Sequence, residues 1–253
     1  MESQLSKDRN RAVLVTGGAR RIGAAITEEL ARAGWNVVVH ANRSRKEADA
    51  LCTHLRLYGV HAWTVTADLS LPNAAHVLFS DTLKLAGRLD AIVNNAALFS
   101  LKREMSDCER ERMLSVNVLQ PEQLTRSLFE HLSARQARGS VVNLLDQRIV
   151  RIAMAVATPY EQSKIRLAQA TAANALSLAP VLRINAVAPG AILCPIEVTA
   201  KEPAGHFPLG CRPTAGHVAE AVRWLLESES ITGQTLYVDS GQHLMVRQSC
   251  TGL

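Results

Sequence analysis

The chain has 253 residues, 47% of them hydrophobic, and a formal net charge of +5 at pH 7. It is long enough to bury a substantial core, and the absence of a basic block interleaved with aromatic residues argues against nucleic-acid binding. Neither the five cysteines nor the eight histidines show metal-ligand or disulfide-framework spacing. The polar N-terminus is unlike a signal peptide, and no apolar run approaches the roughly 18 residues of a membrane span. We therefore expect a cytoplasmic protein that binds no metal and no membrane.

Short apolar strands alternate with amphipathic helices along the whole chain. We expect strands at 12–16, 36–40, 61–70, 89–96, 140–145, 183–190 and 233–239, and helices near 22–33, 45–58, 72–87, 106–135, 160–179 and 215–227. Strands that are apolar throughout, with helices between them, indicate a parallel sheet covered on both faces. The pattern predicts an α/β protein: a single doubly wound Rossmann-type domain over 1–253 with a seven-stranded parallel sheet.

Ligands of doubly wound sheets bind at the carboxyl ends of the strands. We expect the first strands to bind the cofactor and the later strands to carry the catalytic and substrate residues. Residues of about 10–135 form the cofactor half, and those of about 136–253 form the catalytic and substrate half. The segment 191–214 is rich in proline and glycine, which is typical of either a poorly ordered insertion or a lid over a site.

The stretch TGGARRIG at 16–23 joins the first strand to the first helix. A glycine-rich turn at this place lets the backbone approach a pyrophosphate at a helix N-terminus, and Gly17 and Gly23 suit the turn and close-packing roles. Arg20 and Arg21 add two permanent cations beside such a phosphate. An ordinary glycine turn between a strand and a helix is the alternative.

The second strand indicates which dinucleotide binds. Proteins that bind NAD usually carry an acidic residue about 20 residues past the glycine turn, which accepts from the ribose 2′-hydroxyl. Here Asn42, Arg43 and Ser44 follow the strand. Guanidinium binds phosphate bidentately, so Arg20, Arg43 and Ser44 predict a 2′-phosphate site and hence NADPH as the cofactor. A solvated loop is the alternative for Arg43, and His40 ends this strand near the expected adenine.

Tyr160 and Lys164 lie four residues apart and so share one face of the expected helix. The helix start is marked by Thr158 as the cap, Pro159 at the first position and Glu161 three residues after the cap. An ammonium group beside a phenol favours phenolate, so we expect a lowered tyrosine pKa and proton transfer by this pair. A surface-helix pair without function is the alternative.

These motifs together resemble a known family. The recurring stretches are TGGARRIG, ADLS at 67–70, NNAA at 94–97, Asn117, YEQSK at 160–164, APG at 188–190 and ITGQTLYVDSG at 231–241. In order and spacing the chain resembles a short-chain dehydrogenase/reductase from end to end. Arg21 in place of the middle glycine, NRS at 42–44, and Asp146 where most members have serine are similar to the pteridine reductase branch.

The resemblance implies roles for individual residues. Asp146, Tyr160 and Lys164 would transfer protons, Phe99 would stack a pterin against the nicotinamide, and Arg21 would lie near both the cofactor phosphate and the pterin. Asn117 would hold a water that links the lysine to solvent. The remaining implied cofactor contacts are Ile22, Asp68 (adenine), Leu69, Asn94 and Ala96 (ribose), Tyr160, Lys164, Pro189 and Gly190. The structural alternatives are a capping carboxylate for Asp146, a core aromatic for Phe99, a helix-distorting amide for Asn117 and a turn cap for Asp68.

The leading hypothesis is an NADPH-dependent reductase that transfers hydride to a pteridine-type substrate, such as a dihydropterin, dihydrofolate or biopterin. Tyr160 lies fourteen positions after Asp146, one more than the family spacing, so the substrate wall is expected to differ. The alternatives are a ketone or aldehyde reductase with the same machinery, and a catalytically silent regulator that binds NADPH. The resemblance also implies a homotetramer that pairs the helices containing 106–133 and 160–179.

Overall fold

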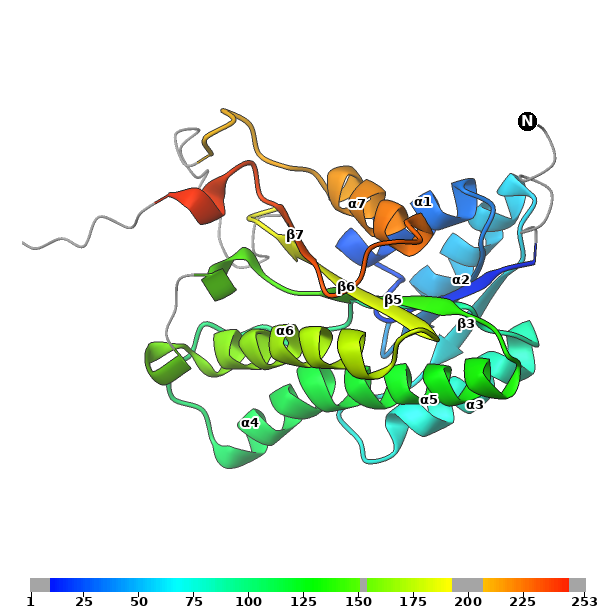
Figure 1. Cartoon of the computed structure of the whole chain (residues 1–253), viewed down its shortest axis with the longest axis horizontal. Coiled ribbons are helices and arrows are strands. Elements are labelled where there is room, and N and C mark those ends of the chain that lie inside the picture. The colour runs from blue at the N-terminus through cyan, green and yellow to red at the C-terminus, as the bar shows by residue number, and fades with distance from the viewer. Residues whose placement is uncertain (1–9, 151–153, 193–206, 246–253) are drawn as a thin grey trace, which may run out of the picture.

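Seven parallel strands form one sheet in the order β3-β2-β1-β4-β5-β6-β7 (Figure 1). The structure is a computed structural model and describes residues 10–150, 154–192 and 207–245. The order reverses between β1 and β4, which is the switch point at which doubly wound sheets bind ligands. The predicted fold is confirmed. The strands are β1 (Ala12–Val15), β2 (Asn36–Ala41), β3 (Ala62–Thr66), β4 (Ala91–Asn94), β5 (Gly139–Leu144), β6 (Leu182–Pro189) and β7 (Thr235–Val238).

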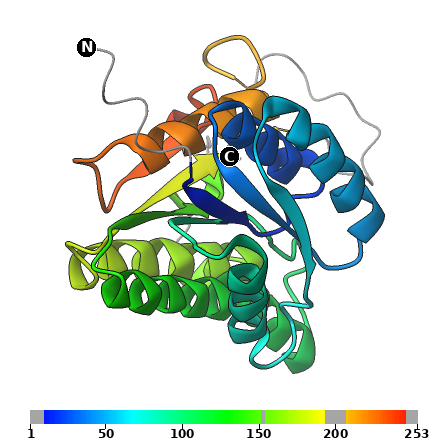
Figure 2. The ribbon, with the colours of Figure 1, turned by 90° about the vertical axis from the view of Figure 1, so that its right-hand side faces the viewer.

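Helices cover both faces of the sheet, as the view in Figure 2 makes plain. One layer holds α1 (Arg21–Arg32), α2 (Arg45–Leu55) and α7 (Ala215–Glu227), and the other holds α3 (Ala74–Ala86), α4 (Asp107–Leu114), α5 (Gln120–Ala134) and α6 (Pro159–Ser177). Shorter helical turns are η1 (Arg56–Tyr58), η3 (Gln147–Val150), η4 (Met154–Val156) and η6 (Gln242–Leu244), and η2 (Ser115–Leu119) is a π-helix. No helix in these described ranges is long and apolar enough to cross a membrane.

The core lies on both sides of the sheet because successive strand residues point to opposite faces. Val13 and Val15 of β1 pack in the cluster that includes Ile26 of α1. Leu14, between them in sequence, packs in the other cluster with Leu128 of α5. A sheet buried on both faces needs strands in which polar and apolar residues do not alternate. The continuous apolar runs in the sequence predicted such a sheet.

One helix prediction was wrong in detail. The helix expected from Pro72 begins at Ala74, because Asn73 takes a left-handed backbone conformation with φ of 59°. The helical region expected over about 106–135 is confirmed, and it consists of α4 and α5 joined by the π-helix that contains Asn117. The helix expected over 160–179 is α6, and its predicted start is confirmed: Thr158 caps it in a reciprocal capping box with Glu161.

The lid predicted for 191–214 lies mostly outside the described residues, which omit 193–206. Of its described end, Phe207 is buried and Thr214 caps α7. The lid stays a prediction.

Candidate active site

Asp146, Tyr160 and Phe99 come together beyond the carboxyl ends of β4 and β5. Asp146 follows β5 by two residues, and Tyr160 lies in the first turn of α6. The Tyr160 hydroxyl donates a hydrogen bond to Asp146 Oδ2 at 3.1 Å. The Phe99 ring meets the Tyr160 ring edge to face, with centroids 4.9 Å apart, and half of Phe99 is exposed. The structure thus joins the three residues that the sequence assigns to substrate and proton transfer.

The electrostatics of Tyr160 differ from the expectation of a lowered pKa. Burial, and next the negative charge of Asp146, raise the pKa of Tyr160 well above its usual value. Lys164 is buried and donates from Nζ to the Leu144 carbonyl oxygen at 2.7 Å, with Nζ 5.9 Å from the Tyr160 ring centroid. Burial lowers the pKa of Lys164 to about 8. In this state the tyrosine is a protonated phenol that donates to a carboxylate, and the raised pKa makes it hold that proton more tightly than a free tyrosine.

Arg148 completes this cluster, and sequence reasoning missed it. Its backbone N–H donates to Asp146 Oδ1 at 3.0 Å, and its side-chain Nε lies 3.6 Å from the same oxygen. Its guanidinium carbon is 5.5 Å from the Phe99 ring centroid. Only the spacing of two residues from Asp146 signals it, because a carboxylate often accepts from the N–H two positions on.

Asn117 sits in the π-helix and fixes the segment that leads to Phe99. Its Oδ1 accepts from the Leu98 N–H at 2.8 Å, and its Nδ2 lies 2.9 Å from both the Leu98 carbonyl oxygen and Ser163 Oγ. The amide therefore ties the Phe99 segment to α6 from within the π-helix. This agrees with the structural alternative named for Asn117, an amide at a distortion of the helix. Its implied role in holding a water stays a prediction. Ser163, which links Asn117 to the Tyr160 carbonyl at 2.6 Å, was missed.

The glycine turn is held by the end of β2. The Gly17 N–H donates to His40 Nδ1 at 3.1 Å, and His40 Nε2 lies 3.1 Å from the Ala67 carbonyl oxygen. Burial lowers the pKa of His40 to about 4, so the neutral ring accepts from Gly17 and donates to Ala67. A Cβ at Gly23 would collide with the Gly17 carbonyl oxygen, which confirms the close-packing role. Asn95, which sequence reasoning missed, donates to the Gly17 carbonyl at 3.1 Å.

The expected phosphate ligands lie around this turn. Arg20 Nη1 is 3.4 Å from Ser44 Oγ and 3.9 Å from Glu47 Oε1, so the structure brings α1 and the loop after β2 together. Asn42 and Arg43 are exposed in that loop. Arg21 is exposed at the start of α1, next to the partly buried Ile22, and has a left-handed φ of 55°.

The residues expected near the adenosine have structural partners. Asp68 Oδ1 accepts from the N–H and the hydroxyl of Ser70, at 2.9 and 2.7 Å, as a turn cap does. Leu69 is buried, and the Ala96 N–H donates to Thr16 Oγ1 at 3.0 Å. Their contacts with a cofactor stay predictions.

Asn94 Nδ2 donates to Asn143 Oδ1 at 2.8 Å, while its own buried Oδ1 has no partner among the described residues. Pro189 ends β6 beside Val238. A Cβ on Gly190 would lie 2.6 Å from the Cβ of Asp239, the residue after β7, so the close packing there requires a glycine. Cofactor roles for Asn94, Pro189 and Gly190 therefore remain predictions.

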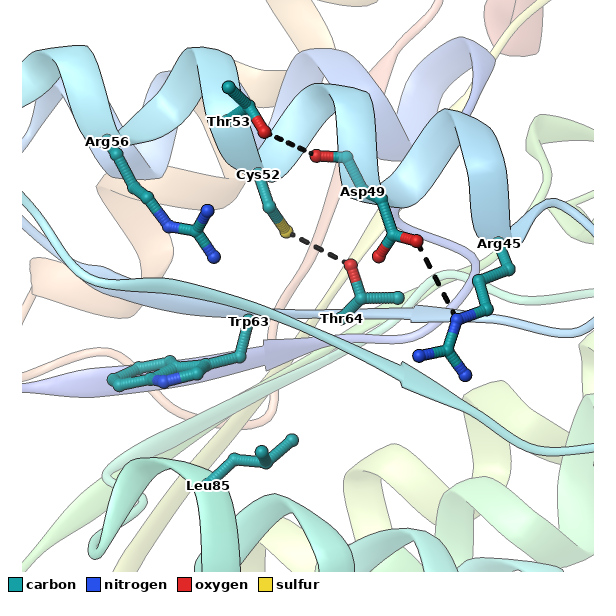
Figure 3. Close-up of a pocket in the computed structure, with 8 residues that line it drawn as sticks. All are labelled: Arg45, Asp49, Cys52, Thr53, Arg56, Trp63, Thr64 and Leu85. Atoms are coloured by element: carbon teal, nitrogen blue, oxygen red, sulfur yellow. Dashed lines mark hydrogen bonds and ion pairs between the residues drawn. The ribbon is translucent and has the colours of Figure 1, made fainter.

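A groove of about 320 Å³ lies at the outer edge of the sheet, between α2 and the edge strand β3 (Figure 3). Arg45 Nε pairs with Asp49 at 3.6 Å, and Cys52 Sγ lies 3.4 Å from Thr64 Oγ1. Its other lining residues are Thr53, Arg56, Trp63 and Leu85. This groove holds none of the catalytic candidates. The described residues contain no group of three or more His, Cys, Asp or Glu that could hold a metal ion.

Comparison with known proteins places this geometry in a family. The family model described as short chain dehydrogenase matches residues 11–204. Glucose 1-dehydrogenase 2 of Bacillus subtilis is 30% identical over 252 residues, covering 94% of this chain and 96% of that protein. The crystal structure of FolM alternative dihydrofolate reductase 1 from Brucella canis, complexed with NADP, superposes with a TM-score of 0.86 at 34% identity, covering 97% of this chain and 99% of that one. Acetoin dehydrogenase YohF from Salmonella typhimurium does so with a TM-score of 0.85 at 26% identity, covering 94% and 98%. The chain belongs to the short-chain dehydrogenase/reductase family of oxidoreductases.

Proposed function

We propose that this protein is an NADPH-dependent reductase of pteridines, with a dihydropterin or dihydrofolate as substrate. The observation that carries the proposal is the hydrogen bond of 3.1 Å between the Tyr160 hydroxyl and Asp146, beside the half-exposed ring of Phe99. An aromatic ring face suits a flat heteroaromatic substrate, and a carboxylate suits its ring N–H groups. The likeness to a solved alternative dihydrofolate reductase supports this reading.

The residues around the glycine turn fit a phosphorylated dinucleotide. The turn packs too closely for a side chain at Gly23, and Arg20, Arg43 and Ser44 offer cationic and hydroxyl donors to a 2′-phosphate. The turn and Arg21 would bind the pyrophosphate at the N-terminus of α1. Asp68, Asn94 and Ala96 would contact the adenosine half, and Tyr160, Lys164 and Gly190 the nicotinamide half. When bound, NADPH supplies the hydride.

The protein's own residues would manage the proton. Reduction of a C=N bond adds hydride to the carbon and a proton to the nitrogen, and Tyr160 is the phenol placed to give that proton. Asp146 orients the hydroxyl and accepts from the substrate. The resulting phenolate would be stabilised by two nearby cations: Arg148, whose charge lowers the pKa of Tyr160, and Lys164, whose Nζ lies 5.9 Å from the Tyr160 ring centroid. Burial of Tyr160 and Lys164 keeps water away from this transfer.

A ketone or aldehyde reductase is the second candidate, in which Tyr160 protonates the forming alkoxide. The relatives named glucose 1-dehydrogenase and acetoin dehydrogenase favour it. Such a reaction has no evident need for Asp146 or Phe99, so these two residues discriminate between the candidates. For either reaction we infer one domain that works in the cytoplasm, and a homotetramer, which the resemblance implies.

The test is the loss of NADPH absorbance when the purified protein meets dihydrobiopterin, dihydrofolate or a panel of ketones, with NADH in parallel. We expect turnover of a pteridine with NADPH and much less with NADH. The variant Asp146→Ala should lose pteridine reduction at least tenfold more than any ketone reduction, because only the pteridine uses the carboxylate. Turnover of ketones alone, or equal losses in the variant, would overturn the pteridine assignment.

A further inference from the structure

Arg148 is a cation at the candidate substrate site whose binding capacity is mostly unused. Its Nε lies 3.6 Å from Asp146 Oδ1, and its guanidinium carbon 5.5 Å from the Phe99 ring centroid. The side chain is 31% exposed. Among the described residues its two Nη groups have no hydrogen-bond partner. A guanidinium held by one edge and open on the other is suited to bind an anion through two parallel N–H donors.

The Asp146 carboxylate does not need this guanidinium to be satisfied. Its Oδ2 accepts from Tyr160 at 3.1 Å, and its Oδ1 accepts from the Arg148 backbone N–H at 3.0 Å. At 3.6 Å the Nε contact is an ion pair rather than a hydrogen bond, and a partly exposed pair of this kind contributes little. The open donors therefore remain available to a ligand.

The chemistry of the reduced bond says which part of a pteridine would meet them. In a 7,8-dihydropteridine the C=N bond that is reduced carries the side chain on its carbon atom. The proton donor Tyr160 and its partner Asp146 serve the nitrogen of that bond. With that nitrogen at Tyr160 and Asp146, the side chain would extend from the adjacent carbon, and Arg148, next to Asp146 and Phe99, would be within reach of it.

We propose that Arg148 is a specificity-determining residue that binds an anionic group, phosphate or carboxylate, on the side chain of the pteridine. The substrate class is thereby an acidic dihydropteridine rather than a neutral one. The inference rests on the proposed function and names the substrate class of that same site.

A pair of probes that differ by one phosphate group tests it: 7,8-dihydroneopterin and its 3′-monophosphate, with dihydrofolate as the carboxylate probe. Steady-state kinetics with NADPH are compared for the wild type, Arg148→Met and Arg148→Lys. We expect Arg148→Met to lower kcat/KM about tenfold more for an acidic probe than for dihydroneopterin, through KM, because a charge-assisted contact is lost. Arg148→Lys keeps the positive charge but not the two parallel N–H donors. Its kcat/KM for the acidic probes should lie between those of the wild type and Arg148→Met. The exposed Arg103, four residues after Phe99, gives the control Arg103→Met, which should treat all probes alike.

Equal losses for neutral and acidic probes, with a shifted pH profile for dihydroneopterin, would overturn the inference, because Arg148 would then act through Asp146 and Tyr160. Loss for the phosphate probe alone, or for dihydrofolate alone, identifies the anion that Arg148 recognises. A wild-type enzyme that turns over no pteridine would overturn the proposed function, and this inference with it. A wild type that reduces all three probes without discrimination in Arg148→Met would overturn only the inference.

Discussion

At the scale of single residues, several side chains of the candidate site have roles that depend on contacts with residues distant in the sequence. Tyr160 and Lys164 could be singled out because their spacing on the helix is local, and Asp146 could be singled out through the family resemblance. Arg148 was not, since its approach to Phe99 depends on the turn at η3. The rise in the Tyr160 pKa was missed for a similar reason: it needs both the burial of the ring and the fold that sets Asp146 against it.

His40 provides a prediction about pH. Its pKa in the folded protein is about 4, below its ordinary value of 6.5, so the unfolded chain takes up a proton first as the pH falls. The stability contributed by the neutral ring is complete above pH 6.5 and is lost as the pH falls towards 4, by about 3 kcal/mol. His40→Gln keeps both hydrogen bonds without the titration, because its amide accepts from Gly17 and donates to Ala67.

Denaturant unfolding at several pH values between 4 and 7 measures this effect. The free energy of unfolding of His40→Gln should depend less on pH than that of the wild type. The exposed His76 gives the control variant His76→Gln, which should keep the wild-type slope. Parallel curves for the wild type and His40→Gln would contradict the assignment of a neutral ring.

At the scale of elements, helix ends and breaks position the site. Boundaries that depend on local chemistry, such as the Thr158 cap of α6, could be predicted from the sequence. The π-helix could not, because the contacts that Asn117 makes from within it, to Leu98 and Ser163, join segments far apart in the chain. The start of α3 was misplaced because Asn73, rather than the proline, sets the boundary through its left-handed backbone.

Thr158 allows the link between a helix cap and catalysis to be tested. Thr158→Ala removes the acceptor of the Glu161 N–H, at 3.3 Å, and should lower the free energy of unfolding by about 1 kcal/mol. It should also lower kcat several-fold, because Tyr160 lies in the turn that the cap orders. Thr214 caps α7 in the same way, accepting from His217 at 3.3 Å, so Thr214→Ala is a matched control. If Thr158→Ala and Thr214→Ala lowered both the free energy of unfolding and kcat to the same extent, the link between the α6 cap and catalysis would be refuted.

At the scale of the whole molecule, the sequence predicted the seven-stranded sheet because every strand is an apolar run between helices. How the molecules assemble is less accessible, since an apolar helix face can pack on the sheet or on another copy. Leu176, at the end of α6, is 84% exposed, which is unusual for a leucine in a helix of the core layer. It lies on one of the two helices that the resemblance assigns to pairing.

Light scattering after size exclusion tests the expected homotetramer. We expect a molar mass about four times the 27.5 kDa of the chain, and a smaller assembly for Leu176→Glu, because a charge would be buried in the interface. Leu57→Glu is the control, since Leu57 is 78% exposed on η1, away from both helices. A wild type that elutes as a single chain would contradict the assembly.

The backbone of Arg21 has a consequence for how this protein can change. At φ of 55° a residue with a side chain costs roughly 1 kcal/mol or more relative to glycine, which adopts this conformation freely. Any selection that rewards heat resistance alone would therefore favour glycine at this position. If Arg21 contacts the cofactor phosphate and the pteridine as proposed, a population kept under demand for turnover should retain the arginine. Glycine or arginine at position 21 in related sequences would thus show whether selection has acted more on thermal stability or on turnover.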